Sequence, residues 1–288
     1  VTCEITNDDD APTLKLVKIV DNGETGATTG ADAWTLSATA ETPNDDRNFS
    51  NAGDAGVFET VYANAAYTLA ESGPDGYTAS DWSCDGGDLQ GDALTLAAGE
   101  TEVTCEITNT AIQPTLTLIK VVEGGTATTA DFQAQIDGSN VDWEVTNDVT
   151  VGERTASEIM NVDNYVAGDW TGDCAADGTV TVELDNDYTC TIVNQDIGPK
   201  LTLIKKVNND HGGDAKPDDF GISVDGTPVT SGATNTYVSN KALAIDEVGL
   251  KGYEFVEITG DEVCPDALKG TVTLKPGDDI AFYEEEVE

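Results

Sequence analysis

The chain has few basic residues and no long apolar run. Its 288 residues include 13 Lys and Arg against 55 Asp and Glu, which gives a formal net charge of −42. Nucleic acids and anionic membranes bind clustered Lys and Arg, so neither is expected as a partner. The acidic surface is typical of a well-hydrated protein suited to high salt, or of a polymer that must stay soluble. Weak binding of divalent ions is the alternative interpretation.

Only one histidine is present, and no pair of cysteines has C-x-x-C spacing. A zinc site is therefore not expected, and no cofactor is expected either. The acidic turns do not match the twelve-residue calcium-loop pattern, so solvated turns are favoured over loose calcium binding. No nucleophile–base pair recurs, so we expect no enzyme that acts on external substrates. A signal peptide, a membrane-spanning run and a wall-sorting tail are also lacking, and we expect a processed product or an excised segment.

Six cysteines stand out in a sequence rich in Thr, Asp, Gly and Ala. They recur once near a tryptophan or an acidic turn, and once in the last strand of a repeating pattern. This spacing predicts a disulfide framework, which forms in an oxidising compartment. We therefore expect a secreted protein located outside the cell or on its surface.

Three segments begin with nearly the same phrase: LKLVKIV at Leu14, LTLIKVV at Leu116 and LTLIKKV at Leu201. Short runs of alternating apolar and polar residues follow each phrase, separated by Gly, Asp, Asn and Pro. This pattern predicts an all-β chain of three tandem immunoglobulin-like β-sandwiches. We assign residues 11–110 to repeat one, 111–196 to repeat two and 197–288 to repeat three, after an N-terminal segment 1–10. Short proline-containing joints between them predict a semi-rigid rod.

Three phrases carry a family resemblance. They are L-x-L-x-K at the start of each repeat, Y-x-L-x-E-x-x-P-x-G-Y at Tyr67–Tyr77, and V-x-C-x-I-x-N at Val103–Asn109. They resemble the prealbumin-like repeats of bacterial surface proteins, the Cna-B or SpaA type found in Gram-positive adhesin stalks and pilins. The resemblance extends over nearly the whole chain and is weakest in the middle of repeat two.

Many members of that family form an internal isopeptide bond between a first-strand lysine and a last-strand asparagine, promoted by a glutamate. The matching residues are Lys18, Glu71 and Asn109 in repeat one, Lys120, Glu158 and Asn194 in repeat two, and Lys205 and Glu247 in repeat three. Alternate residues of a strand share a face, so the repeat-one set should point into the core. A buried lysine that loses its proton is able to attack the carboxamide, with release of ammonia.

Repeat three lacks the asparagine, and counting along its last strand places Val287 at that position. The three glutamates that follow Tyr283 predict a poor continuation of this strand into the core. In each repeat the alternative is a buried Lys–Glu ion pair without a covalent bond. A disulfide on the same last strand is a further alternative, replacing the amide bond.

The cysteines of repeats one and two flank similar hairpins. The simplest interpretation pairs Cys84 with Cys105 and Cys174 with Cys190. Cys264 occupies the corresponding place in repeat three, but its partner position falls on Tyr283. Cys264 and Cys3 are thus both left over, which suggests a disulfide between subunits.

The N-terminal letters VTCEITN recur unchanged at Val103–Asn109, where they close repeat one. We hypothesise that the N-terminal copy pairs with repeat three of the next subunit by β-strand addition. Cys3 would then meet Cys264, and Asn7 would meet Lys205, while the segment IAFY ends the sheet or is displaced. The alternative is a remnant of a preceding repeat in a longer chain.

Together these patterns favour a structural subunit of an extracellular filament, pilus or surface stalk. Its chemistry would be covalent cross-linking of itself, and its partner a head-to-tail homopolymer. The alternative function is an adhesin or binding stalk that contacts a host or matrix ligand, with this chain a fragment of a longer multi-repeat protein.

Overall fold

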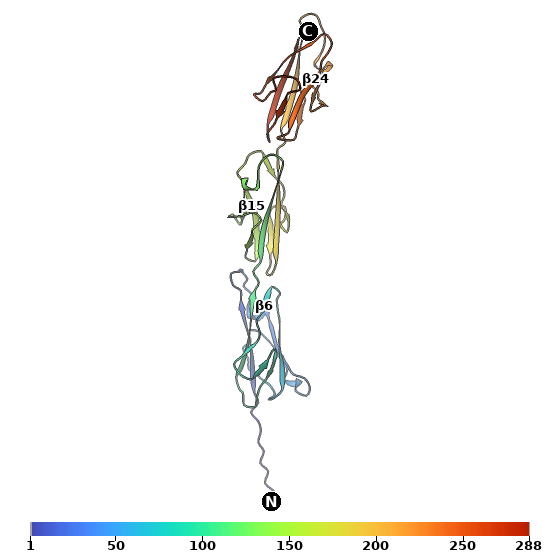
Figure 1. Ribbon diagram of the computed structural model, residues 1–288. Helices are drawn as coiled ribbons and strands as arrows, with labels where there is room; N and C mark the ends of the chain where they lie inside the picture. Colours follow the sequence, from blue (N-terminus) through green and yellow to red (C-terminus); the bar gives the residue numbers. More distant parts are fainter. Residues whose placement is uncertain (1, 288) are drawn as a thin grey trace. The chain divides into compact units, whose positions relative to one another are not determined.

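The computed structural model describes residues 2–287, and within them every regular element longer than three residues is a β-strand (Figure 1). Helical geometry occurs there only in four 3₁₀ turns: η1 (Ala31–Ala33), η2 (Asp45–Arg47), η3 (Thr129–Asp131) and η4 (Pro217–Asp219). The strands form six sheets, two in each repeat. The prediction of an all-β chain with three β-sandwiches is confirmed.

Repeat one comprises ten strands: β1 (Thr13–Asp21), β2 (Thr35–Thr39), β3 (Phe49–Ala52), β4 (Glu59–Thr60), β5 (Ala66–Ser72), β6 (Tyr77–Ala79), β7 (Ser83–Cys84), β8 (Asp88–Gln90), β9 (Ala93–Thr95) and β10 (Val103–Ala111). One sheet has the order β4-β1-β10-β6, with β7 also paired to β10. The other has the order β3-β2-β5-β9-β8.

Repeat two comprises nine strands: β11 (Thr115–Glu123), β12 (Phe132–Ile136), β13 (Ser139–Val141), β14 (Thr146–Asp148), β15 (Gly152–Met160), β16 (Tyr165–Ala167), β17 (Thr171–Gly172), β18 (Thr179–Val182) and β19 (Asp187–Asp196). Its sheets have the orders β14-β11-β19-β16, with β17 on β19, and β13-β12-β15-β18.

Repeat three comprises eight strands: β20 (Lys200–Asn208), β21 (Gly221–Val224), β22 (Thr227–Pro228), β23 (Thr234–Thr236), β24 (Ala242–Val248), β25 (Glu254–Gly260), β26 (Thr271–Thr273) and β27 (Asp279–Val287). Its sheets have the orders β23-β20-β27-β25 and β22-β21-β24-β26.

Alternation along each first strand places a lysine in the core together with its apolar neighbours. In β1, Leu14, Leu16 and Lys18 are buried, while the intervening side chains are half-buried. The alternating residues of β20 repeat this arrangement and end with Lys205, which is also buried. An apolar stripe therefore carries one ionisable group into each of these sandwiches, because every second residue of a strand faces the same side.

The first and last strands of a repeat lie next to each other. In repeat one, β1 and β10 pair in parallel, with Leu16 opposite Cys105 and Val20 opposite Asn109. In repeat three, β20 and β27 also pair in parallel, from Lys200 to Asn208. The lysine of the opening strand and the residues that close the sandwich thus share one sheet.

The end of repeat three differs from the sequence-based expectation. Strand β27 continues through Val287, and Glu284 and Glu286 are buried within it. The expectation that this strand continues poorly after Tyr283 was wrong, since β27 pairs with both β20 and β25 over this stretch. Repeat three therefore has its own closing strand in the structure.

Candidate cross-linking sites

In repeat one, the two sheets bring together a lysine, a glutamate and an asparagine. Lys18 lies on β1, Glu71 on β5 and Asn109 on β10. The Lys18 ammonium donates a hydrogen bond to Glu71 Oε2 and lies 5.1 Å from the centre of the Trp34 ring. The Lys18 side chain is 0% exposed and that of Glu71 is 16% exposed, so the ion pair is largely removed from water.

Burial changes the protonation of this lysine. Desolvation lowers the pKa of Lys18 below its ordinary value, and the hydrogen bond and charge of Glu71 oppose that shift without cancelling it. A lowered pKa increases the fraction of neutral amine, which is the nucleophilic form. The site thus favours the protonation state that amide formation requires.

Asn109 is buried, and its Oδ1 has no hydrogen-bond partner. A buried acceptor without a partner costs about 1–3 kcal/mol. The amide carbonyl therefore lies in the interior without a protein hydrogen-bond donor. Such an orphaned group suggests a function in chemistry rather than in stability.

Repeat two contains the same three residue types in direct hydrogen-bond contact. Lys120 Nζ lies 2.5 Å from Glu158 Oε2, and Asn194 Nδ2 donates to Glu158 Oε1 across 2.7 Å. Glu158 therefore bridges the amine and the carboxamide, one oxygen to each. Desolvation lowers the pKa of Lys120, opposed by Glu158, and the lysine also lies 4.2 Å from the centre of the Phe132 ring.

The bridging geometry is suited to proton transfer between the two reacting groups. A glutamate in contact with both is able to take a proton from the ammonium and deliver it to the departing nitrogen. Asn194 is fully buried, and like Asn109 it leaves Oδ1 without a partner. Attack of the Lys120 amine on the Asn194 carboxamide carbon would form an amide and release one ammonia.

Repeat three replaces the asparagine with acidic residues. Lys205 Nζ lies 2.5 Å from Glu247 Oε2 and 3.2 Å from Glu286 Oε1. The prediction that Val287 takes the asparagine position is wrong by one residue. Val207 lies opposite Glu286, as Val20 lies opposite Asn109 in repeat one. Glu286 thus occupies the asparagine position.

Glu284 is the second acidic residue that the sequence reasoning missed. It lies opposite Lys205 on β27, and burial, followed by the charge of Glu247, raises its pKa to about 7. Burial likewise raises the pKa of Glu286 to about 7. The period-two pattern Phe282-x-Glu284-x-Glu286 was the available signal, because it places both carboxyls on the face of a core phenylalanine.

Four of the six cysteines form disulfides within repeats: Cys84 with Cys105, and Cys174 with Cys190. Cys3 is free and exposed, and Cys264 is free and half-buried. In repeat one Leu16 lies opposite Cys105, and in repeat three Leu203 lies opposite Phe282. The partner position of Cys264 is therefore Phe282 rather than Tyr283, and burial raises the pKa of its thiol to about 11.

The N-terminal segment forms no strand in the structure. Residues 2–12 are irregular, and Cys3 and Ile5 are exposed. Val1, the first residue of the hypothesised donor strand, lies outside the described residues. The place beside β20 that this strand would take is occupied by β27.

Within residues 2–287, no helix has the length and apolarity that crossing a bilayer requires. No group of three or more His, Cys, Asp or Glu in that range has an arrangement suited to a metal ion.

Comparison with known proteins identifies a matching family. The model of the prealbumin-like fold domain, SpaA type, matches residues 9–107, 112–192 and 196–281. None of the curated proteins compared matches the chain.

Among solved structures, the Bacillus anthracis TIE protein is similar over 97% of this chain, with 15% identity and a TM-score of 0.50. The chain spans about half of that protein, 51% of its length. A C-terminal fragment of the pilus adhesin SpaC from Lactobacillus rhamnosus GG matches 65% of this chain and 98% of its own, with 12% identity and a TM-score of 0.35. Two B repeat units of the Staphylococcus aureus collagen-binding protein match 96% of this chain and 75% of their own, with 14% identity and a TM-score of 0.30.

Proposed function

The chain belongs to the prealbumin-like fold domain family of the SpaA type, and on that premise we propose that it is a structural segment of an extracellular filament or surface stalk, stiffened by amide bonds between its own strands. The observation that carries the proposal is the bridging glutamate of repeat two, which contacts Lys120 and Asn194 at once. Repeat one supplies the same residue types around a buried lysine.

The topology explains what such a bond would do. In repeat one, β1 and β10 are the first and last strands of the sandwich and lie side by side. A bond from Lys18 to Asn109 joins them directly. Tension that enters at β1 then leaves at β10 through the covalent link, so the other strands of the sandwich carry no load.

Stretching single chains by their two ends tests this function. We expect repeats one and two to contribute no unfolding step, and Lys18→Arg to restore the step of repeat one. Lys15→Arg is the matched control, because Lys15 lies on the same strand but on the opposite face. Full-length unfolding steps from both repeats in the unaltered chain would contradict the proposal.

Head-to-tail joining is the finer part of the proposal. The exposed Cys3 and the unpaired Cys264 support it. Because β27 occupies the place beside β20, the segment Thr2–Asn7 of a second copy would have to displace it. That displacement would further expose the half-buried Cys264.

The register of β27 on β20 supports such a displacement. Aligned on its identical copy at Val103–Asn109, the incoming segment puts Ile5 at the place of Glu284 and Asn7 at the place of Glu286. An apolar and an amide side chain would replace two buried carboxyls, which are costly to ionise in the interior. Non-reducing electrophoresis of concentrated protein tests the idea. A ladder that reductant or Cys3→Ser abolishes supports joining, and a monomer band alone contradicts it.

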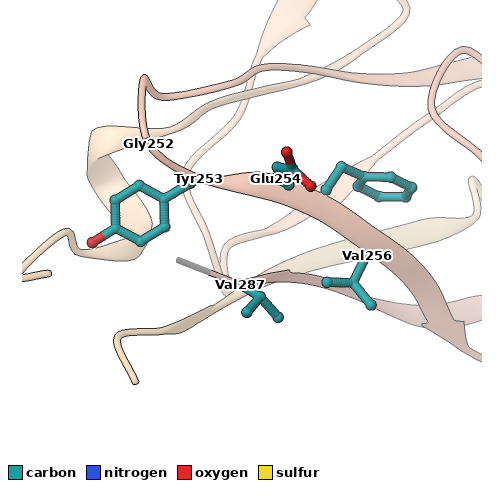
Figure 2. A pocket seen from close by; sticks show the side chains of 6 residues that line it. Gly252, Tyr253, Glu254, Val256 and Val287 are labelled. Atoms are coloured by element: carbon teal, nitrogen blue, oxygen red, sulfur yellow. The ribbon is translucent and has the colours of Figure 1, made fainter. Parts of the chain in front are cut away.

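A binding stalk is the second candidate function. It is favoured by an open hollow of about 630 Å³ in repeat three, lined by Tyr253, Val256 and Val287 among others (Figure 2). Glu254 is the one charged residue among the described residues that line it. Adhesion to immobilised matrix proteins that Tyr253→Ala weakens would favour this candidate over a purely structural one.

A further inference from the structure

Repeat three concentrates four ionisable groups in its interior. The side chains of Lys205, Glu247 and Glu286 are 0%, 1% and 1% exposed, and Glu284 is 0% exposed. Fully ionised, one ammonium and three carboxylates would leave two uncompensated negative charges in the core. Unpaired buried charge is strongly unfavourable, so some of these carboxyls must hold protons or react.

The hydrogen bonds of the cluster are incomplete. Both carboxyl oxygens of Glu284 and Oε2 of Glu286 have no partner. An ion pair with Lys205 therefore does not satisfy the site. Repeats one and two each leave one asparagine Oδ1 without a partner, but they avoid the excess negative charge, because each places one carboxyl and one neutral carboxamide near its lysine.

The positions of two glutamates correspond to those of a helper and a reacting group. Glu247 lies on β24 opposite Ile222, as Glu71 lies on β5 opposite Leu36. Glu286 lies on the last strand at the position that Asn109 takes in repeat one. The Lys205 amine lies between them, 2.5 Å from Glu247 and 3.2 Å from Glu286.

We propose that Lys205 and Glu286 condense to an amide, a covalent modification of repeat three that releases water instead of ammonia. The proposal rests on the proposed cross-linking function and extends it to a repeat without the asparagine. It assigns Glu247 as the proton carrier and leaves Glu284 as a neutral neighbour in the core. Once the amide has formed, β27 stays beside β20, so displacement by a second copy is open only to chains in which Lys205 and Glu286 are not linked.

The step balances in atoms and charge. Glu247 takes one proton from the Lys205 ammonium, and the resulting amine attacks Cδ of protonated Glu286. A bond forms between Nζ and Cδ, and the bond from Cδ to one oxygen breaks. That oxygen leaves as water, carrying its own hydrogen and one that Glu247 relays from the amine nitrogen. The products are a neutral amide, one water and protonated Glu247.

The raised pKa of Glu286 supports condensation with the Lys205 amine. Burial raises the pKa of Glu286 to about 7, so the protonated, electrophilic acid is populated near neutral pH. Condensation replaces an ammonium and a carboxyl with one neutral group, which the dry core accommodates better. Water that leaves to solvent does not readily return to a site whose side chains are at most 1% exposed.

Intact mass combined with peptide mapping of the full chain tests the proposal. We expect the mass of one water to be missing and a cross-linked peptide that joins Lys205 to Glu286. Glu286→Gln should change the missing mass at this site from one water to one ammonia, because the leaving group changes. Glu284→Gln is the matched control and should leave the missing water unchanged.

The outcomes separate the two proposals. Loss of ammonia from repeats one and two without loss of water in repeat three overturns this inference and leaves the proposed function intact. Loss of water with no loss of ammonia supports this inference and contradicts the proposed Lys–Asn bonds of repeats one and two. A link from Lys205 to Glu247, or unlinked Lys205 and Glu286 peptides from folded protein, would also overturn it.

Discussion

Glu286 lies opposite Val207 in the parallel pairing of β20 with β27, at the position where Asn109 lies opposite Val20 in repeat one. The same place in the fold thus carries a carboxyl in one sandwich and a carboxamide in another. In both, a buried lysine on the first strand has a glutamate of the other sheet as its hydrogen-bond partner. In an amide-forming reaction, repeat three would therefore have a different leaving group at the same site.

Removing the reacting asparagine of repeat one should destabilise that repeat. Asn109→Ala deletes the proposed bond to Lys18, which would close a loop of nearly the whole sandwich. For loops of about 100 residues, the chain-entropy model gives about 4–5 kcal/mol. Denaturant unfolding should show a loss of about this size in the free energy of unfolding. The mass missing from the variant, relative to its own sequence, should be smaller by one ammonia, because this site no longer releases one. Stability loss without the mass change would indicate an ion pair only.

Removing the bridging carboxylate of repeat two should block its cross-link while preserving shape. Glu158→Gln keeps the size of the side chain, but a carboxamide does not take a proton from Lys120. The peptides that contain Lys120 and Asn194 should then be recovered unlinked. Glu153→Gln serves as a control, because Glu153 lies on the same strand and is exposed. A link that persists in Glu158→Gln would assign the proton transfer to another group.

Reduction should weaken repeats one and two but not repeat three. The Cys84–Cys105 and Cys174–Cys190 bonds span 21 and 16 residues. Loops of this size are each worth about 3 kcal/mol in the chain-entropy model. Replacing both cysteines of one pair with alanine should lower the free energy of unfolding of that repeat by about this amount. Equal stability of the reduced and oxidised chain would show that the bonds do not contribute.

The stability of repeat three should fall as pH rises when its cross-link is prevented. The pKa of Glu284 is raised from 4.5 to about 7 by burial, so the folded state binds this proton more tightly than the unfolded state. The contribution is therefore fully present below about pH 4.5 and is lost as pH rises through about 7. Denaturant unfolding of Lys205→Met across this range should show the decline. Adding Glu284→Leu should reduce it without abolishing it, because burial also raises the pKa of Glu286 to about 7. A stability that rises with pH would contradict the burial of this carboxyl.

The β-sandwich repeats were predictable from sequence because their determinants are local and repeated. The alternation Leu14-x-Leu16-x-Lys18 fixes a strand and its inward face, and similar phrases mark the start of each repeat. Alternation along that strand likewise places Lys18 in the core, where the structure has it. Period two in a strand is a strong signal when apolar residues occupy every second position.

The end of repeat three was not predictable with the same certainty. Without a cysteine or asparagine as a landmark, the count along the last strand slipped by one residue, from Glu286 to Val287. In a strand such a slip moves every side chain to the other face. Buried glutamates are also rare, so the sequence predicts a poor continuation of the buried strand at Glu284 and Glu286. Only the pairing of β27 with β20 resolves the register.

The most direct test of the account is the intact mass of the folded and then reduced chain. We predict a mass below that of the reduced sequence by two ammonia, for Lys18–Asn109 and Lys120–Asn194, and by one water for Lys205–Glu286. A mass equal to that of the unmodified sequence would contradict the central claim that buried lysines join the first and last strands covalently.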